Sequence, residues 1–477
     1  MKMLISRLSL AGIAIILCAT FLVAQPDTLW TRTAGGDLWD AAYDVVATTD
    51  GGCIAVGGSS SFGHEKGDLY LIRFDADGDT VWTRVFGDEG WDEGRGICVT
   101  SDGNYAVTGH TFSYGEIYAD VWLMKISGDG DSLWAKTYGE AAGDFGWDLC
   151  ELTDGGFLIT GDAFYSETGW DMYLVKIDAE GDELWTNHFG GYNDDIGFSV
   201  IEASDGGYVI AGASNSFDDG DADAYVVKTD SDGVLQWEKT YGDIGWGKND
   251  EVHDICKTSD GDFIITGSTE SYGEGKYDFY VLRIDPAGDT VWTRTYGGSK
   301  NEFSRGICEA SDSSWIIAGA SESFSEWNYD VWAVKIDING DSFWTAQYGT
   351  PEDDYALGVC AGADGSFFFA GQTSSPEEES NFYIVKTEIP SGIEEKFLTV
   401  SDIELKTFIN RIAWSISDKR SGNVKLDLYS TDGRLMLSET VLHKDSWKAP
   451  TTLSQGVYFA QITAGSCSAK TKLIVIR

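Results

Sequence analysis

The chain has 477 residues and contains 58 Gly, 18 Trp and 22 Tyr but only 6 Pro, which suits many short strands joined by tight turns rather than a disordered chain. Its formal net charge is −45, and because residues 391–477 are slightly basic, the negative charge is concentrated in residues 25–390. That field repels nucleic acid and anionic membranes, which excludes nucleic-acid binding, and it favours solubility and cation binding.

The first 24 residues have the organisation of a secretory signal peptide. Lys2 and Arg7 give a positive start, an apolar run follows to Val23, and Ala24 is a small residue ahead of a cleavage point before Gln25. Leu22 is bulky for its position relative to that point, so a retained membrane anchor is the alternative. No later run is apolar enough to span a bilayer. We expect a secreted or cell-surface protein that keeps no membrane span after signal removal.

Residues 25–390 are dominated by an internal repeat of 51 to 55 residues. Its most regular marker is a tryptophan within a strand-like run: Trp30, Trp82, Trp134, Trp185, Trp237, Trp292 and Trp344. Three more strand-like runs follow each tryptophan run, and in the second unit they are 96–100, 105–109 and 120–126. Asp102-Gly103 is a hairpin turn signal between the first two. Four strands per unit at this period predict a β-propeller.

The two ends of the repeat predict how the ring closes. The last unit ends at 381–387 without a tryptophan strand, whereas the strand at 28–33 has no unit before it. Placing that N-terminal strand outermost in the last blade completes seven blades and leaves no open sheet edge between the ends. An open solenoid is the alternative. The hairpin before each tryptophan strand resembles that of quinoprotein-like propellers, which implies that the runs ending in Thr-x-Asp-Gly are innermost and line a channel.

Cysteines share one position of the repeat: Cys98, Cys150, Cys256, Cys308 and Cys360. Val46 and Ile201 occupy the same position in the other two units, as expected for a buried apolar site. A disulfide framework needs paired positions, so we expect free thiols.

After residue 390 the repeat stops and the composition changes. Three pieces mark the new segment: 424–429, Asp432-Gly433-Arg434 and 453–459, followed by the basic and apolar ending 470–477. In order and spacing, residues 397–477 resemble the C-terminal sorting domain of the type IX secretion system. The resemblance implies a small Ig-like β-sandwich after a linker at 391–396, and type IX-like secretion machinery as partner. A plain Ig-like accessory domain is the alternative.

Two sets of acidic residues recur on the face that carries the longer loops. The first set comprises Asp40, Asp92, Asp144, Asp195, Asp250, Glu302 and Asp354. The second comprises Asp68, Asp120, Asp171, Asp223, Asp278 and Asp330, with Asn381 in the last unit. The first set predicts Ca²⁺ coordination at each blade mouth. The alternative is that each carboxylate accepts hydrogen bonds from loop N–H groups, which repetition in all seven units favours.

Departures from the repeat are the better guide to a ligand site. An insertion at 243–250 places Trp246 beside Asp250, and Trp91 and Trp147 lie in corresponding loops, as does Trp39. Trp170 and Trp327 belong to the other loops of that face. Exposed indoles beside acids predict a sugar-stacking surface formed by Trp91, Trp147, Trp246, Asp250 and Trp327. Tryptophans that only pack between blades are the alternative.

Catalytic motifs are scarce: the five histidines show no metal-ligand spacing, and no phosphate-binding loop is recognisable. The sequence therefore favours an all-β, exported, non-catalytic binding or surface-adhesion protein whose ligand is a glycan or a protein. The alternative is an extracellular glycan-active hydrolase that uses a carboxylate pair on the long-loop face. Two or three acids with raised pKa values, meeting in blades whose neighbours lack them, would distinguish the second.

Overall fold

A computed structural model describes residues 26–388, apart from 116–117, 140–142, 218–220, 243–246, 326–327 and 375–378, together with the strands of the C-terminal region. The chain divides into two compact units, one formed by Gln25–Gly392 and the other containing Ile393–Arg477. None of the described residues forms a helix with the length and apolarity needed to cross a membrane. The predicted signal peptide and the predicted linker lie outside the described residues.

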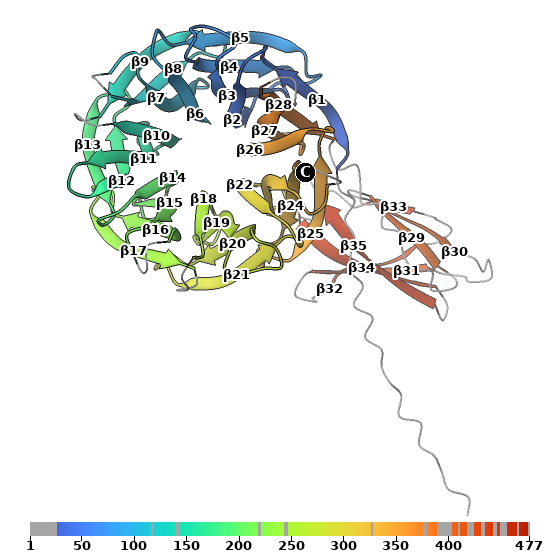
Figure 1. The fold of residues 1–477 in the computed structure, drawn as a ribbon. Coiled ribbons are helices and arrows are strands. Elements are labelled where there is room, and N and C mark those ends of the chain that lie inside the picture. The colour runs from blue at the N-terminus through green and yellow to red at the C-terminus, as the bar shows by residue number, and fades with distance from the viewer. Residues whose placement is uncertain are drawn as a thin grey trace, which may run out of the picture. The chain divides into compact units, whose positions relative to one another are not determined.

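The first unit is a seven-bladed β-propeller, in which seven four-stranded antiparallel sheets surround a central axis (Figure 1). The first blade contains β2 (Asp40–Ala47), β3 (Cys53–Ser59), β4 (Asp68–Phe74) and β5 (Thr80–Phe86), ordered from the axis outward. The second and third blades repeat this order with β6 (Asp92–Val99), β7 (Tyr105–Thr111), β8 (Asp120–Ile126), β9 (Ser132–Tyr138), β10 (Asp144–Glu151), β11 (Phe157–Tyr165), β12 (Gly169–Ile177) and β13 (Glu183–Phe189).

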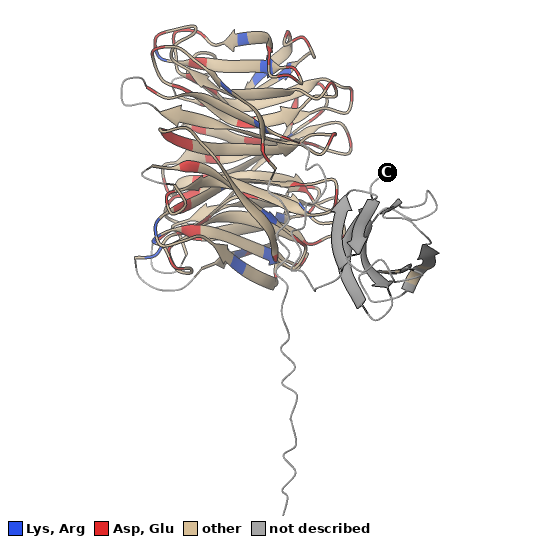
Figure 2. Ribbon diagram, turned by 90° about the vertical axis from the view of Figure 1, so that its right-hand side faces the viewer, with Lys and Arg blue, Asp and Glu red and all other residues tan. Residues whose placement is uncertain are grey.

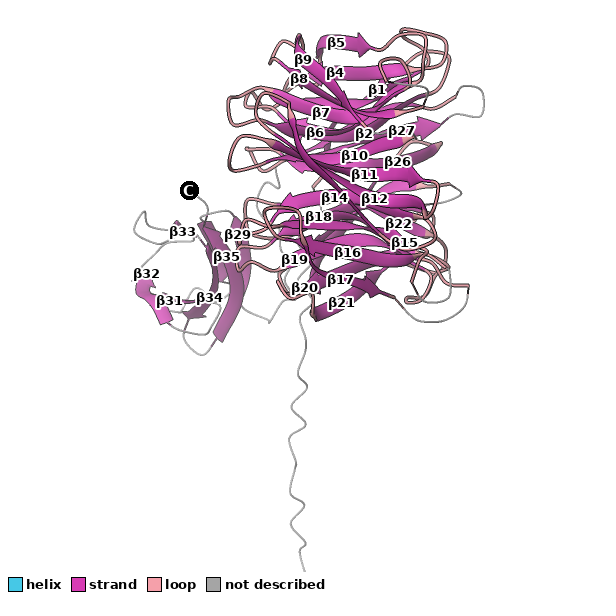
Figure 3. Ribbon diagram, turned by 90° about the vertical axis from the view of Figure 1, so that its left-hand side faces the viewer, coloured by secondary structure: helices cyan, strands magenta, loops and turns pink. Residues whose placement is uncertain are grey.

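The next three blades follow the same pattern. They contain β14 (Asp195–Glu202), β15 (Tyr208–Ser214), β16 (Asp223–Thr229), β17 (Leu235–Tyr241), β18 (Asp250–Lys257), β19 (Phe263–Thr269), β20 (Asp278–Ile284), β21 (Thr290–Tyr296), β22 (Glu302–Glu309), β23 (Trp315–Ser321), β24 (Asp330–Ile336) and β25 (Ser342–Tyr348). Figure 3 shows the described part of the propeller as strands and loops only.

The last blade is completed by the N-terminal strand, as the sequence predicts. Its order is β26 (Asp353–Ala361), β27 (Phe367–Ser374), β28 (Asn381–Thr387) and then β1 (Thr28–Ala34). Trp30 pairs with Lys386 in this closing ladder, and the Glu388 N–H donates to the Asp27 carbonyl over 2.7 Å. The closed ring leaves no inter-blade edge open, and the open-solenoid alternative is wrong.

The apolar cores lie between neighbouring blades. In one of them, Ile54 and Val56 of the first blade pack with Val107, Trp122 and Met124 of the second. The second strand of most blades is buried along its whole length because sheets cover both of its faces. Each fully buried large apolar side chain contributes roughly 1.5–3 kcal/mol relative to exposure, so the blades stabilise one another rather than folding separately.

The repeated tryptophan of the outer strand fastens its blade to the next. The Trp82 indole donates to the Gly128 carbonyl of the following blade over 3.3 Å, and Trp292 donates in the same way to Ile338 over 3.0 Å. Trp30, on the closing strand, donates to Ala76 of the first blade over 2.9 Å. The same bond, made also by Trp237 to the Pro286 carbonyl, gives the repeated tryptophan a shared role at four of the junctions.

Each inner strand begins earlier than the sequence pattern indicates. The pattern starts the strand of the second unit at Gly96, whereas β6 begins at Asp92. The first set of acids therefore occupies the opening residues of the inner strands rather than the preceding loops, and Asp354 is the second residue of β26. Figure 2 shows acidic residues in the loops at both faces of the propeller.

The six cysteines of the described propeller are free thiols. Cys98, Cys150, Cys256 and Cys360 are partly exposed as residues and pack against the apolar clusters between blades. Burial of the sulfur raises the pKa of each of these thiols, so they stay protonated and unreactive. The prediction of free thiols is confirmed.

The C-terminal unit contains two antiparallel sheets. One has the order β29 (Ile403–Phe408), β30 (Arg411–Ile416), β33 (Ser446–Lys448), and the other β32 (Leu435–Val441), β31 (Val424–Ser430), β34 (Gly456–Ala464), β35 (Cys467–Val475). The described elements of this region are strands, and the Ig-like sandwich and its sorting role stay predictions.

Candidate functional site

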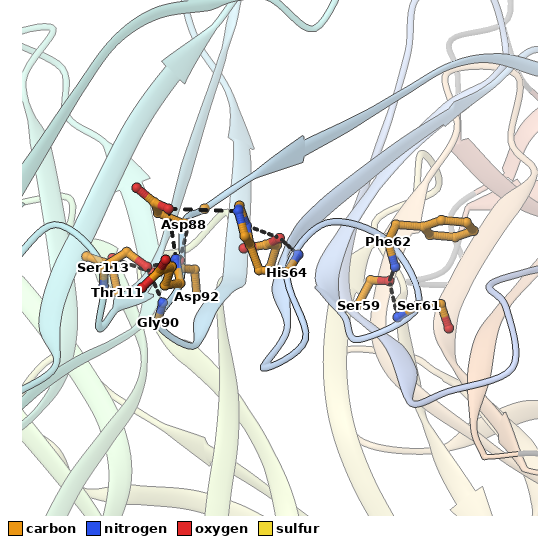
Figure 4. Close-up of polar contacts among 12 residues, drawn as sticks. Ser59, Ser61, Phe62, His64, Asp88, Gly90, Asp92, Thr111 and Ser113 are labelled. Carbon is orange, nitrogen blue, oxygen red and sulfur yellow. Dashed lines mark hydrogen bonds and ion pairs between the residues drawn. The ribbon is translucent and has the colours of Figure 1, made fainter.

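The first set of acids organises the long-loop face. Asp92, at the start of β6, accepts hydrogen bonds from the Thr111 hydroxyl, from the Ser113 hydroxyl over 2.5 Å and from the Asp88 N–H over 3.0 Å (Figure 4). The Ser113 hydroxyl in turn accepts from the Gly90 N–H over 2.9 Å. One buried carboxylate therefore holds both loops of its blade in place.

The same arrangement recurs around the ring. Asp40 accepts from Ser59, Ser61 and the Gly36 N–H, and Asp195 accepts from Ser214, Ser216 and the Gly191 N–H. Corresponding bonds reach Asp250, Glu302 and Asp354. This geometry supports the loop-organising interpretation of the set. Within the described residues no group of three or more His, Cys, Asp or Glu side chains is placed to hold a metal, so Ca²⁺ binding stays a prediction without a geometric site.

The second set of acids lies beside the first at the blade junctions. A Cβ added to Gly87 would meet Asp68 Oδ1 at 1.9 Å and Asp92 Oδ2 at 2.7 Å, so only glycine fits between the two carboxylates. At another junction, burial and the charges of Asp354 and Asp353 raise the pKa of Asp330 to about 6. His64 adds a feature found in one blade only, since its ring lies 3.2 Å from Asp68 Oδ2 and 3.8 Å from Asp88 Oδ1 (Figure 4).

A β-bulge interrupts every inner strand and distinguishes the blades chemically. In β6 the register passes from Gly94 to Gly96, which leaves Arg95 without a partner on β7. The corresponding unpaired residues form what we call the axial belt: Tyr43, Arg95, Trp147, Phe198, His253, Arg305 and Leu357. A bulge re-aims the side chain of its extra residue and is common beside functional sites.

Belt residues of neighbouring blades contact one another. The Arg95 guanidinium lies over the Tyr43 ring at 3.7 Å and over the Trp147 ring at 4.6 Å. Phe198 continues this row, with ring centroids 5.9 Å from Trp147 and 4.8 Å from His253. Arg305 then lies 2.6 Å from His253 Nε2. Six blades therefore share one row of aromatic and cationic side chains on the innermost strands.

The row is most elaborate in the second and third blades, in what we call the Arg95 cluster: Trp91, Glu93, Arg95, His110, Trp147 and Asp162. The Trp91 indole donates to Glu93 Oε1 over 2.9 Å, and the Arg95 guanidinium forms an ion pair with Glu93 Oε2. Within the third blade, the Trp147 indole, which lies under the Arg95 guanidinium, donates to Asp162 Oδ1. Two tryptophans and two acids are thereby joined through one arginine.

Burial shifts the protonation of this cluster. It raises the pKa of Glu93 against the opposing effect of Arg95, and it raises the pKa of Asp162 to about 6. Burial, together with the Arg95 charge, lowers the pKa of His110 to about 3, so this imidazole is neutral. The position of Glu93 is occupied by Ala41 in the first blade and Phe145 in the third, whereas the fifth blade also has an acid there, Glu251. The cluster therefore departs from the neighbouring blades.

Aromatic side chains gather beside the cluster and on the later blades. His110 meets the Phe145 ring at 4.8 Å, and Phe145 meets Trp170 at 5.5 Å. In the fifth to seventh blades the rings of Tyr277, Phe303, Tyr329 and Tyr355 follow one another at centroid distances of 5.0, 6.1 and 5.2 Å. These residues come from the opening of the inner strands and the adjacent loops, which places them on the long-loop face.

The predicted ligand residues are brought together in part. Trp91 and Trp147 meet in the Arg95 cluster, and Trp91 remains 45% exposed, which leaves its ring open to a ligand. Asp250 belongs instead to the first set of acids, where Thr269 and Ser271 donate to it. Trp246 and Trp327 lie outside the described residues.

Sequence reasoning missed Glu93, Arg95, His110 and Asp162. Arg95 follows a strictly repeated acid by three residues, at a position filled by a different chemistry in almost every unit. Comparing the units position by position would have shown that the residue at this position varies. It would not have shown the bulge that leaves Arg95 without a partner on β7.

No protein-family model matches the chain. Among curated proteins it is 27% identical over 201 residues to Regulatory protein FlaEY of Caulobacter vibrioides, in a match that covers 37% of this chain and 21% of that protein. The chain therefore spans about a fifth of the length of this relative.

Among solved structures, a protein of unknown function from Bacteroides caccae matches with a TM-score of 0.40 and 14% identity, covering 62% of this chain and 93% of that one. One from Dyadobacter fermentans matches with a TM-score of 0.42 and 11% identity, covering 75% and 99%. An α-L-arabinanase of Penicillium chrysogenum complexed with arabinobiose matches with a TM-score of 0.43 and 11% identity, covering 61% and 91%. The strand order of the chain itself shows the seven-bladed β-propeller, and the two bacterial structures similar to it are of proteins of unknown function.

Proposed function

We propose that this protein is an exported binding or surface-adhesion module that recognises a glycan on the long-loop face, at the axial end of the second and third blades. The observation that carries the proposal is the half-exposed ring of Trp91, which the hydrogen bond to Glu93 fixes in place beside Arg95. A rigid aromatic face next to hydrogen-bonding groups suits a sugar ring, whose C–H face stacks while its hydroxyls bond.

A glycan-array screen of the full-length exported chain tests this proposal, with and without Ca²⁺. We expect binding that Trp91→Ala weakens at least about fivefold, since stacking interactions of this kind contribute on the order of 1 kcal/mol or more. Leu133→Ala is the matched control, because Leu133 is 51% exposed on the outer strand β9. Binding that survives Trp91→Ala, or no glycan binding in either condition, contradicts the proposal and turns attention to protein ligands. Loss of binding on removing Ca²⁺ would support the ion-binding interpretation of the acids.

A second candidate, an extracellular glycan-active hydrolase, rests on one observation. Glu93 and Asp162 both have raised pKa values and lie on either side of Arg95 and Trp147, in blades whose neighbours lack these acids. A carboxyl group whose pKa is raised above its ordinary value is better suited to act as a general acid. The test is hydrolysis of the glycans that bind, with Glu93→Gln and Asp162→Asn as variants. Turnover lost in both variants while binding persists supports catalysis, and binding without turnover in the wild type excludes it.

We further propose that residues 397–477 direct export by a type IX-like route. The support is the sequence pattern of this segment and its separation from the propeller as a compact all-β unit. In a host with that secretion system, deleting 397–477 should retain the protein inside the cell envelope, and fusing the segment to an unrelated protein should export it. Unchanged export after the deletion would contradict this role.

A further inference from the structure

Three aspartates connect the inner strands of neighbouring blades directly after the bulge. Asp44 accepts a hydrogen bond from the Ile97 N–H of the next blade over 2.9 Å, and Asp254 accepts one from Ile307 over 2.7 Å. Asp148 makes the same contact with the Val200 N–H over 3.0 Å. We call Asp44, Asp148 and Asp254 the junction aspartates, because each fastens its blade to the following one.

Ser199 of the fourth blade joins two of them. Its hydroxyl oxygen lies 2.8 Å from Asp148 Oδ2 and 2.9 Å from Asp254 Oδ1, and the residue is only 3% exposed. A hydroxyl carries a single proton, so it donates to one carboxylate at a time. The other contact becomes a hydrogen bond only if that carboxyl group is itself protonated and donates to the serine oxygen.

Among the residues that the structure describes, the charges that act on Asp44 and Asp254 are those of other carboxylates and not of cations. Coulomb repulsion from Asp148 acts on both Asp44 and Asp254, and the largest influence on all three is burial. The thiols packed nearby are held neutral by burial: Cys98, Cys150, Cys256, Cys308 and Cys360. The arginines of the axial belt contact other residues. Arg95 forms an ion pair with Glu93, and Arg305 contacts His253.

We propose that the propeller holds at least one proton at neutral pH on the Asp148–Ser199–Asp254 chain, and that losing it as the pH rises weakens the ring at the junctions of the third to sixth blades. This inference does not depend on which ligand the long-loop face binds. It makes the packing between these blades sensitive to pH.

The direction of the effect follows from proton linkage. Burial raises the pKa of Asp148 to about 6, of Asp254 to about 7 and of Asp44 to about 8 in the folded chain. In the unfolded chain an aspartate titrates near 3.9. The folded state therefore binds more protons between these values, so the contribution of these three groups to stability is fully present below about pH 4 and is lost as the pH rises to about 8.

The test compares the full chain with Asp254→Asn, Asp148→Asn and Ser199→Ala. Unfolding the wild type at pH 7 should release on the order of one carboxyl proton that Asp254→Asn does not release. The melting temperature of Asp254→Asn should exceed that of the wild type by about 5 °C at pH 8 and approach it at pH 5. Ser199→Ala removes a donor that lowers both pKa values, so its pH midpoint should move upward.

Asp129→Asn is the matched control, because Asp129 is exposed in a turn and should follow the wild-type curve. Equal proton release by the wild type and Asp254→Asn at pH 7, or parallel melting curves of the two from pH 5 to pH 8, would overturn the proposal. If Asp254→Asn does not fold, Asp148→Asn gives the same two readouts.

Discussion

The outer strands and the axial belt are built from the same repeat but obey different rules. On the outer strands the same tryptophan recurs in every blade, and its indole makes an equivalent hydrogen bond at junctions as far apart as Trp30 to Ala76 and Trp292 to Ile338. In the axial belt no two adjacent blades carry the same residue. The difference indicates that the periphery maintains the ring, whereas the axis is free to carry specificity.

The largest loss of stability is expected when the ring is opened. Deleting residues 26–34 removes the closing strand and takes Trp30 from its contacts with Phe74 and Phe368. We expect the melting temperature to fall by more than about 15 °C, because the last blade loses its outer strand and a core side chain. Circular dichroism and limited proteolysis measure the loss. Leu29→Ala, at a half-exposed position of the same strand, should behave as the wild type.

The two regions should also respond differently to loss of a similar arginine. Arg95→Met leaves buried Glu93 without its ion-pair partner, so we expect a loss of about 3–5 kcal/mol in the free energy of unfolding. Arg84→Met removes an arginine that also stacks on a tryptophan, but on the more exposed outer strand β5, and should change stability by about 0–1 kcal/mol. Denaturant titration compares them, and the double variant Arg95→Met/Glu93→Gln should recover part of the loss. Equal effects of the two single variants would contradict the distinction.

The inner and outer strands can also be compared in acid, by replacing one histidine in each and measuring how stability depends on pH. Burial lowers the pKa of His110 to about 3 in the folded chain, whereas an unfolded histidine titrates near 6.5. The unfolded state therefore binds more protons below pH 6.5, and the wild type loses stability as the pH falls toward 3. His110→Phe should reduce this loss by roughly 2–3 kcal/mol between pH 6.5 and pH 4. His188→Phe, at an exposed position of the outer strand β13, is the matched control for the substitution itself. Identical slopes for the two variants would show that His110 does not titrate as expected.

The smallest effect concerns a single outer-strand hydrogen bond. Trp82→Phe keeps an aromatic ring but loses the N–H that donates to Gly128, so we expect a loss of about 1 kcal/mol in the free energy of unfolding. Glycan binding should be unaffected, in contrast to Trp91→Ala. Binding that weakens in Trp82→Phe without unfolding would mean that the outer strands take part in recognition.

Much of the fold is predictable because the repeat is regular. The spacing of the tryptophans predicts the number of blades, and the unmatched strands at 28–33 and 381–387 predict the closure that the structure shows. Trp91 is found from its place in a loop, whereas Trp147, predicted in the corresponding loop, lies instead at the bulge of the strand β10. Arg95 and Asp162 are not, because a single belt or strand position carries no recognisable motif until the bulge and the neighbouring blade bring it beside another residue.

Features that recur with the sequence repeat can be predicted from the sequence alone: four strands per unit, seven units, and the turn and hydrogen-bonding residues that repeat with them. Which side chains meet across a junction is known only from the tertiary structure. The Asp148–Ser199–Asp254 chain joins residues about fifty positions apart in three different blades, and each alone is an ordinary polar residue. Their burial in one layer, away from water and from cations, gives them a shared chemistry that no single repeat unit contains.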